Sequence, residues 1–278
     1  MTNQKVAVVT GSSSGIGYET ALMLARNGFR TYATMRNLEK AKPILDIAKK
    51  EKLSLHVLKL DVIDEKSVND AIKTIKYDAG RIDVLVNNAG YGLIGALEDL
   101  SLSEIKAQYE TNVFGLIRVT QAVLPIMREQ KSGIIVNVGS IGGKMALPLS
   151  SPYIGTKFAV EGLSESIAYD LEPFGIKVVI IEPGAIKTNF DTGMVVAKNN
   201  QNQNSPYYES MQKLQNSLIS VVKNGTLPTK VAEVILRAIT SPNPDLRYTV
   251  GDDAALLAQK RKDLSDSDFQ KLVLEFLK

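Results

Sequence analysis

Two side chains that could exchange a proton with a substrate lie four residues apart, Tyr153 and Lys157. Residues at this spacing share one face of a helix, so the phenol and the ammonium would be neighbours. A phenol titrates at about pH 10, and a nearby ammonium lowers its pKa because it favours the phenolate. General acid–base catalysis needs a pKa close to the working pH, and this pair provides the means.

The alternative for this pair is an ordinary contact on a helix surface. Of the ten tyrosines, however, only Tyr153 has a lysine four residues later. It also lies at the opening of a predicted helix, behind a predicted strand end that bears Ser140. Position and pairing together favour the catalytic interpretation.

A glycine-rich turn, TGSSSGIG at residues 10–17, follows the first apolar run of the chain. A strand is predicted before this turn and a helix behind it. Glycines allow a tight turn and let the backbone approach a pyrophosphate at the positive end of the helix. The spacing is Gly-x-x-x-Gly-x-Gly, not Gly-x-Gly-x-x-Gly. The context predicts dinucleotide binding, and the alternative is a turn that uses glycine only for its backbone freedom.

Apolar runs that predict strands alternate with amphipathic stretches that predict helices, as in βαβ units. The pattern predicts an α/β fold, a Rossmann-type doubly wound parallel sheet of about seven strands with helices on both faces. No linker or repeat interrupts it, so residues 1–278 are expected to form one domain. Strands are expected at 6–10, 30–35, 55–60, 82–86, 133–138, 178–181 and 247–250, and helices at 19–27, 37–52, 101–127 and 152–171.

Three details of the helices can be predicted. Ser101 and Glu104 have the spacing of a capping box, and a bend is expected at Pro125 of the same helix. Ser151 is the expected N-cap of the helix that carries Tyr153. Pro43 either interrupts or starts the helix expected at 37–52.

Two segments break the alternation of strands and helices. Residues 185–228 form a long insertion, predicted to be a lid, and inward-facing Met211, Leu214 and Leu218 would suit a hydrophobic substrate. The C-terminal tail predicts a helix that docks on its own domain or on a partner subunit, with a membrane-surface helix as the alternative. Its apolar residues are Phe269, Leu272, Val273, Phe276 and Leu277.

The composition excludes several classes of protein. Hydrophobic residues make up 44% and charged residues 23%, which is typical of a soluble globular protein. With a net charge of +3 and no run of five like charges, no nucleic-acid partner is expected. No cysteine occurs and His56 is the only histidine, so neither a metal site nor a Ser–His–Asp triad is expected. No apolar run is long enough for a membrane span, and a cytoplasmic location is expected.

These motifs together resemble the short-chain dehydrogenase/reductase family, and the resemblance extends from Val6 to about Val250. The stretches YATMRNLEK and DLRYTVG are similar to the branch that holds 17β-hydroxysteroid and retinol dehydrogenases. The motifs that occur in the order and spacing of the family are TGSSSGIG at 10–17, NNAG at 87–90, Asn112, Ser140, YIGTK at 153–157 and PG at 183–184.

The resemblance implies a role for each member of a catalytic set. Tyr153 would be the general acid in carbonyl reduction and the base in alcohol oxidation. Lys157 would lower the pKa of Tyr153 and bind the nicotinamide ribose. Ser140 would hold the substrate oxygen, and Asn112 would position a water that links Lys157 to solvent through a bend in its helix. Asn112 alone could equally be a helix-interior asparagine bonded to its own backbone.

The resemblance also implies which residues contact the cofactor. For one of them, Asp61, the alternative is a role in a turn or a helix cap. The implied contacts are Gly11, Ser13, Ser14, Gly15, Ile16 and Gly17 of the glycine turn, Arg36, Asp61 and Val62 near the adenosine, Asn88, Ala89 and Gly90 after the fourth strand, Tyr153 and Lys157, and Pro183, Gly184, Ile186 and Thr188 along the nicotinamide.

The predicted cofactor is NADP(H), with NAD(H) the weaker alternative. Enzymes that prefer NAD place a carboxylate at the end of the second strand, whereas residues 31–38 contain no acid. Arg36 follows that strand, and a guanidinium can pair with a 2′-phosphate. Ser13 could add a hydroxyl contact. The alternative for Arg36 is an exposed surface arginine, and Ser14 is uncharged where a second basic residue would strengthen the signal.

The sequence therefore predicts an NADP-dependent oxidoreductase that transfers a hydride between the cofactor and an alcohol or carbonyl. The substrate is expected to be a hydrophobic small molecule, such as a ketone, an aldehyde, or a steroid- or retinoid-like compound. Two alternatives are a reductase of carrier-bound 3-oxoacyl chains and a non-catalytic nucleotide-sensing protein of the same fold. The helices at 109–127 and 152–171 are the family's usual subunit contacts, which implies a homodimer or homotetramer.

Overall fold

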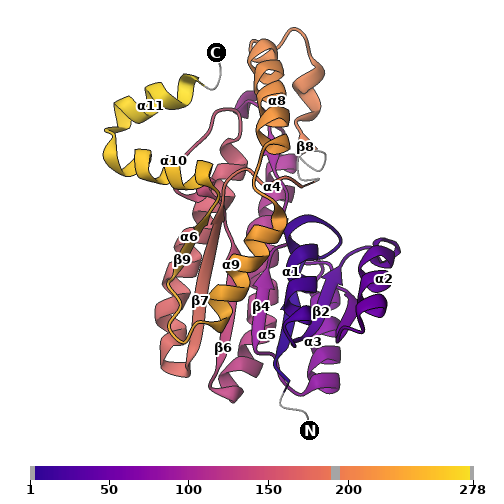
Figure 1. The fold of residues 1–278 in the computed structure, drawn as a ribbon. Helices are drawn as coiled ribbons and strands as arrows, with labels where there is room; N and C mark the ends of the chain where they lie inside the picture. The colour runs from indigo at the N-terminus through magenta and orange to yellow at the C-terminus, as the bar shows by residue number, and fades with distance from the viewer. Residues whose placement is uncertain (1–3, 189–194, 276–278) are drawn as a thin grey trace.

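Seven parallel strands form the central sheet, in the order β3-β2-β1-β4-β6-β7-β9 (Figure 1). The computed structural model describes residues 4–188 and 195–275. The order confirms the predicted doubly wound sheet, and it reverses between β1 and β4, where such folds bind ligands. The strands are β1 (Val6–Val9), β2 (Arg30–Met35), β3 (Leu55–Lys59), β4 (Val84–Asn87), β6 (Gly133–Val138), β7 (Ile176–Pro183) and β9 (Arg247–Val250).

Helices cover both faces of this sheet, as predicted (Figure 1). Side chains of a strand alternate between faces, and β1 shows the result: Ala7 and Val9 pack in one core, Val6 and Val8 in the other. Both faces of a parallel sheet are therefore buried. The first core contains α1 (Gly15–Arg26), α2 (Lys42–Glu51) and α9 (Pro228–Thr240), and the second contains α3 (Glu65–Ala79), α5 (Gly115–Gln130) and α6 (Ser151–Leu171).

Some helix boundaries differ from the prediction. α1 begins at Gly15, inside the glycine turn, not at Glu19. Pro43 lies in the first turn of α2, after a short 3-10 turn η1 (Leu38–Ala41), so it starts that helix. α6 begins at Ser151, which makes Ser150 the N-cap residue. The differences arise because caps are set by backbone geometry that one side-chain type does not determine.

The helix expected at 101–127 is divided into α4 (Leu102–Tyr109), a π-helical segment η3 (Glu110–Phe114) and α5. The capping box of Ser101 and Glu104 is present with both of its hydrogen bonds. The break in the regular α pattern lies in η3, whereas Pro125 is inside α5, which continues to Gln130. A π turn inserted in a helix is frequent at functional sites, and this one carries Asn112.

Residues 195–228, the larger described part of the segment 185–228, lie above the carboxyl ends of the strands (Figure 1). Its elements are β8 (Val195–Val196), η6 (Lys198–Gln201) and α8 (Tyr208–Lys223). β8 pairs in parallel with β5 (Leu93–Ile94), a pairing that the sequence did not predict. As expected, Met211 and Leu214 of α8 are buried, and they pack with Ile94.

The C-terminal tail forms α10 (Asp252–Asp263) and α11 (Asp266–Leu274), drawn in yellow in Figure 1. Phe269 and Val273 are buried against Ile141 and Met145, and Leu272 packs beside them. The predicted docking of this tail on its own chain is confirmed for these residues. Phe276 and Leu277 lie outside the described residues.

Within residues 4–188 and 195–275, no helix has the length and apolarity needed to cross a membrane. The remaining short 3-10 turns are η2 (Leu97–Asp99), η4 (Ile141–Gly143) and η5 (Glu172–Phe174).

Candidate active site

The glycine turn between β1 and α1 leaves the start of the helix open. Gly11 and Gly15 both have positive φ, at 68° and 61°, a region that disfavours side chains. Ser14 is the N-cap of α1, but its side chain makes no capping hydrogen bond, and the first turn has no acidic residue. The N–H groups of that turn can therefore bind an anionic group, as a pyrophosphate requires.

The turn is braced by the end of β4. The Asn88 side chain donates through Nδ2 to the carbonyl oxygens of Thr10, at 2.9 Å, and Gly11, at 3.2 Å. In return, Thr10 Oγ1 accepts from the N–H groups of Asn88 and Ala89, at 2.9 and 3.0 Å. A Cβ on Gly17 would lie 2.4 Å from Asn88 Nδ2. The Asn88 amide nitrogen is thus committed to the turn itself.

The structure brings Ser140, Tyr153 and Lys157 together. Ser140 follows β6, and the other two lie on α6, whose N-terminal part packs against η4. The hydroxyls of Ser140 and Tyr153 are hydrogen-bonded. Lys157 Nζ lies 5.7 Å from the centroid of the Tyr153 ring and donates to the Val138 carbonyl oxygen at 3.0 Å.

Burial controls the proton affinity of this pair. It raises the pKa of Tyr153, and the hydrogen bond from Ser140 opposes that rise only in part. The net direction is opposite to the one expected from a neighbouring lysine alone. Burial also lowers the pKa of Lys157 to about 8. At neutral pH the phenol therefore carries its proton, which is the state a general acid needs.

Asn112 is buried and bonded away from its own helix. Its Nδ2 donates to the Tyr91 carbonyl oxygen at 2.9 Å and to Thr156 Oγ1 at 3.1 Å, and its Oδ1 accepts from Tyr91 N–H at 3.0 Å. The alternative of a helix-interior asparagine bonded to its own backbone is therefore wrong. The side chain instead joins the loop after β4 to α6, next to Tyr153.

The loop after β7 lies against the glycine turn. The Thr188 methyl carbon is 3.3 Å from the point where a Cβ on Gly15 would lie. Ile186 forms a bridge with Thr226, so the two ends of the segment 185–228 meet there. Pro183 and Gly184, at the end of β7, complete this side of the site.

Asp253 is a contributor that the sequence did not predict. Its Oδ2 accepts from the N–H of Ala185 at 2.7 Å, and a Cβ on Gly184 would lie 2.3 Å from the same oxygen. The carboxylate thus attaches the start of α10 to the loop after β7. Gly251 followed by two acids is a pattern for a helix start, but nothing in it indicates a partner 68 residues away.

The residues predicted around the adenosine differ in their exposure. Arg36 lies on the surface after β2, and among the described residues it makes no hydrogen bond or ion pair. Asp61 Oδ1 accepts from Ile63 N–H at 3.3 Å, so the turn role holds for this side chain. Val62 is buried. The remaining predicted contacts, Ser13, Ile16 and Gly90, line or border the same edge of the sheet.

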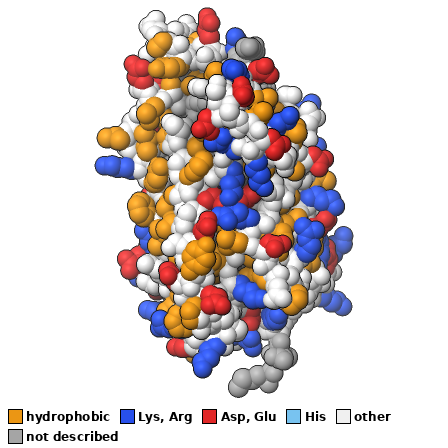
Figure 2. Space-filling model, turned by 90° about the vertical axis from the view of Figure 1, so that its left-hand side faces the viewer, with side chains coloured by type: hydrophobic (Ala, Val, Ile, Leu, Met, Phe, Trp, Pro, Cys, Tyr) orange, Lys and Arg blue, Asp and Glu red, His pale blue; other side chains and the backbone are white. Residues whose placement is uncertain are grey.

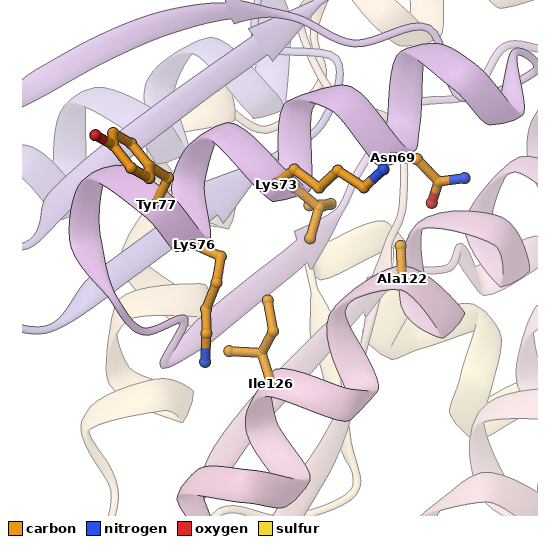
Figure 3. Close-up of a pocket in the computed structure, with 7 residues that line it drawn as sticks. Asn69, Lys73, Lys76, Tyr77, Ala122 and Ile126 are labelled. Carbon is orange, nitrogen blue, oxygen red and sulfur yellow. The ribbon is translucent and has the colours of Figure 1, made fainter.

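A shallow hollow lies elsewhere, between α3 and α5 (Figure 3). It has a volume of about 440 Å³ and contains none of the predicted site residues. Its lining residues are Asn69, Ile72, Lys73, Lys76, Tyr77, Ala122 and Ile126.

Curated relatives match most of the chain. A 3-ketodihydrosphingosine reductase of Bacteroides thetaiotaomicron is 37% identical over 258 residues, which cover 93% of this chain and 92% of the relative. The human 17-beta-hydroxysteroid dehydrogenase type 1 is 37% identical over 274 residues, covering 95% and 83%.

Solved structures share the fold. A short-chain dehydrogenase from Streptomyces avermitilis has a TM-score of 0.85 at 33% identity, covering 98% of this chain and 96% of its own. An alcohol dehydrogenase from Thermococcus sibiricus, complexed with 5-hydroxy-NADP, has a TM-score of 0.74 at 25% identity, covering 90% and 97%. A short-chain dehydrogenase/reductase from Burkholderia phymatum, in complex with NAD, has a TM-score of 0.82 at 24% identity, covering 96% and 95%.

The family profile described as short chain dehydrogenase matches residues 5–199, which include the glycine turn, Asn112, Ser140 and the Tyr153–Lys157 pair. With this match and relatives of such coverage, the chain belongs to the short-chain dehydrogenase family.

Proposed function

We propose that this protein is an NADP(H)-dependent oxidoreductase that interconverts hydrophobic alcohols and carbonyl compounds. The observation that carries the proposal is the grouping of Ser140, Tyr153 and Lys157 at the carboxyl edge of the sheet, beside an open helix start. A nucleotide-sensing protein without turnover has no need of this grouping.

The residues present fit a dinucleotide. Gly11 and Gly17 let the turn pack closely against Asn88 and Ala89, where a Cβ would clash, and the first turn of α1 has no side-chain cap to compete for its N–H groups. Thr188 lies against Gly15 of the turn, and Pro183 is the last residue of β7, the strand that leads to Thr188. When bound, a nicotinamide supplies the hydride, and all proton chemistry remains with the protein.

In the direction of reduction, Tyr153 donates its proton to the carbonyl oxygen as the hydride arrives at the carbon. Ser140 holds the same oxygen, because its hydroxyl already lies in hydrogen-bond contact with the phenol. Lys157 stabilises the phenolate that forms, and Asn112 holds the loop after β4 against α6. In oxidation the proton moves the other way.

An apolar substrate suits the lid. Met211, Leu214 and Leu218 pack with Ile94 and Leu149 above the strand ends, so this part of the segment 185–228 forms a carbon-rich cluster there. The two curated relatives are named for 3-ketodihydrosphingosine and for 17-beta-hydroxysteroids, and both names denote apolar ketones or alcohols.

The NADP(H) preference is supported by Arg36. Its guanidinium follows β2, is exposed and forms no ion pair among the described residues, so a 2′-phosphate would gain a cation without displacing an ion pair. A hydrogen bond to a charged group is worth roughly 1.5–3 kcal/mol, and exposure favours the lower figure. Arg36→Ala should therefore reduce the NADPH-over-NADH preference in kcat/KM about tenfold. A parent enzyme that prefers NADH would contradict the assignment.

The test of the proposed activity is to follow NADPH oxidation against a panel of aliphatic ketones, aldehydes, steroids and 3-oxoacyl thioesters. We expect turnover with apolar ketones or aldehydes. Preference for the thioesters would instead support the carrier-bound acyl reductase. NADPH binding with no turnover on any class would support the nucleotide-sensing alternative.

We also propose a homodimer or homotetramer formed through η3, α5 and α6. Phe114 of η3 is 50% exposed and Phe158 of α6 is 47% exposed, and phenylalanine is enriched at protein interfaces. The cytoplasmic location stays a prediction from the sequence.

A further inference from the structure

A buried acid lies one helical turn beyond the predicted catalytic lysine. Glu161 is on α6, four residues after Lys157, and its side chain is on the same face of that helix. It is only 6% exposed, although glutamate is rarely buried without a specific partner. None of the roles assigned above uses it.

The loop that carries Ser140 is folded around this side chain. A Cβ on Gly143 would lie 2.8 Å from Glu161 Cγ, and one on Gly139 would lie 3.3 Å from Glu161 Oε1. Both glycines, one on each side of Ser140 and its turn, thus leave room for the acid. The position of this loop therefore depends on where Glu161 lies.

Charged groups from three other elements face Glu161. Arg247 of β9 donates through Nε to its Oε2 at 3.0 Å, and Lys144, after η4, lies 3.3 Å from the same oxygen. Glu182 of β7 is a second buried acid, 3.5 Å from Lys144 and 3.7 Å from Arg247. Glu165, farther along α6, pairs with Arg247 at 2.5 Å. On the face of the molecule seen in Figure 2, basic side chains gather near the middle beside acidic ones.

One oxygen of Glu161 is directed toward the catalytic set. Oε2 takes both cation contacts, whereas Oε1 is buried without a hydrogen-bond partner among the described residues. Oε1 faces Gly139, the residue after Val138, and the Val138 carbonyl oxygen accepts from Lys157 Nζ. The carboxylate and the ammonium thus lie against consecutive residues at the end of β6.

We propose that Glu161 is a positioning residue of the active site, whose carboxylate lies beside the Lys157 ammonium at the end of β6 and whose bulk holds the loop that carries Ser140. The inference rests on the proposed function, since it assigns a role within the same site.

The electrostatics of Lys157 support this role. Burial lowers its pKa, and the charge of Glu161 opposes that effect. Burial raises the pKa of Glu161 on balance, and the charge of Glu182 adds to that rise, while the hydrogen bond from Arg247 and the charge of Lys144 oppose it in part. Arg247 and Lys144 thus favour the ionised carboxylate, and the charge of that carboxylate favours the protonated amine.

The central variant is Glu161→Gln, which keeps the shape and removes the charge. In the parent we expect kcat/KM to fall on the alkaline side near pH 8, where Lys157 loses its proton. In Glu161→Gln this alkaline limb of the pH profile should move to lower pH by about half a unit or more, because the ammonium of Lys157 loses the negative charge that stabilises it. The alkaline fall in NADPH affinity, measured by fluorescence titration, should move in the same direction. Glu161→Asp keeps the charge and should keep the limb close to the parental pH.

Glu165→Gln is the matched control, because Glu165 pairs with the same Arg247 but is 45% exposed. It should leave both profiles unchanged. If Glu161→Gln moves the limb no more than this control does, the proposal is wrong.

Should Glu161→Gln fail to fold, Lys144→Met removes a cation that favours the ionised carboxylate, so the pKa of Lys157 and the alkaline fall in kcat/KM should move to lower pH. An unmoved fall would overturn the proposal. A parent that reduces no ketone would refute the proposed function. The pH dependence of NADPH affinity would still test the role of Glu161 in that case.

Discussion

Replacing Gly17 with alanine tests whether the glycine turn is close-packed around the nucleotide site or is only a flexible connection. A Cβ at this position would lie 2.4 Å from Asn88 Nδ2 and 2.5 Å from the Gly11 carbonyl oxygen. Neither neighbour can move alone, because the Asn88 amide also binds the Thr10 carbonyl oxygen at 2.9 Å, and Gly11 is held at positive φ.

The cost of this substitution can be worked out from these distances. Non-bonded heavy atoms are most stable at roughly 3.5 Å, so the start of α1 would have to move by about 1 Å. Overpacking of this kind costs about 1–3 kcal/mol, and alanine recovers at most ~1 kcal/mol of helix propensity. We therefore expect Gly17→Ala to lower the free energy of unfolding by about 1–2 kcal/mol. The displaced N–H groups should also weaken NADPH binding by about tenfold or more.

The assay is urea unfolding followed by circular dichroism, with NADPH affinity measured on the same preparations. Gly162→Ala is the matched control, because Gly162 is also helical but has no atom within 4 Å of the added Cβ. This control should stabilise the subunit by about 0.5–1 kcal/mol and leave NADPH binding unchanged. If Gly17→Ala is as stable as the parent and binds NADPH equally well, the close packing described for the turn is wrong.

Other perturbations address the remaining parts of the site. Tyr153→Phe should lower turnover about 100- to 10,000-fold while NADPH still binds, and near-parental turnover would refute its role as general acid. Asp253→Ala should weaken NADPH binding on the order of tenfold, since it removes a charged acceptor worth roughly 1.5–3 kcal/mol, whereas the exposed Asp252→Ala should not. The segment 185–228 should be cleaved by protease in the free enzyme and protected by NADPH plus substrate, and equal cleavage would argue for a role in assembly. Light scattering should show a dimer or tetramer, which Phe114→Glu should dissociate, and a monomeric parent would contradict the proposed assembly.

The sequence predicted those features that depend on local spacing. The period of the apolar runs is enough to place the strands, because the two faces of a parallel sheet are both buried. The glycine turn and the pair Tyr153 and Lys157 are likewise defined within eight residues of chain. Their positions at the carboxyl edge of the sheet follow from the fold.

Contacts between distant parts of the chain could not be predicted in this way. Glu161 meets Arg247 across 86 residues, and Asp253 meets the Ala185 N–H across 68. Nothing in the local sequence of either acid names its partner, because a single acid on a helix is ordinarily solvated. The resemblance implied a bend in the helix that carries Asn112, but the residues around it did not predict the π segment itself, since they suit a regular α-helix equally well.

The protonation of the catalytic pair shows why position matters beyond residue type. Spacing alone suggests that Lys157 lowers the pKa of Tyr153, but burial of both groups reverses the result, with the phenol pKa raised and the amine pKa lowered to about 8. A buried pair of this kind favours states with few charges, so the tyrosine keeps its proton until negative charge develops on the substrate oxygen. That arrangement favours proton donation, and hence carbonyl reduction, at neutral pH. Oxidation requires the phenolate, so its rate should rise with pH as long as Lys157 remains charged, and Glu161 extends that range.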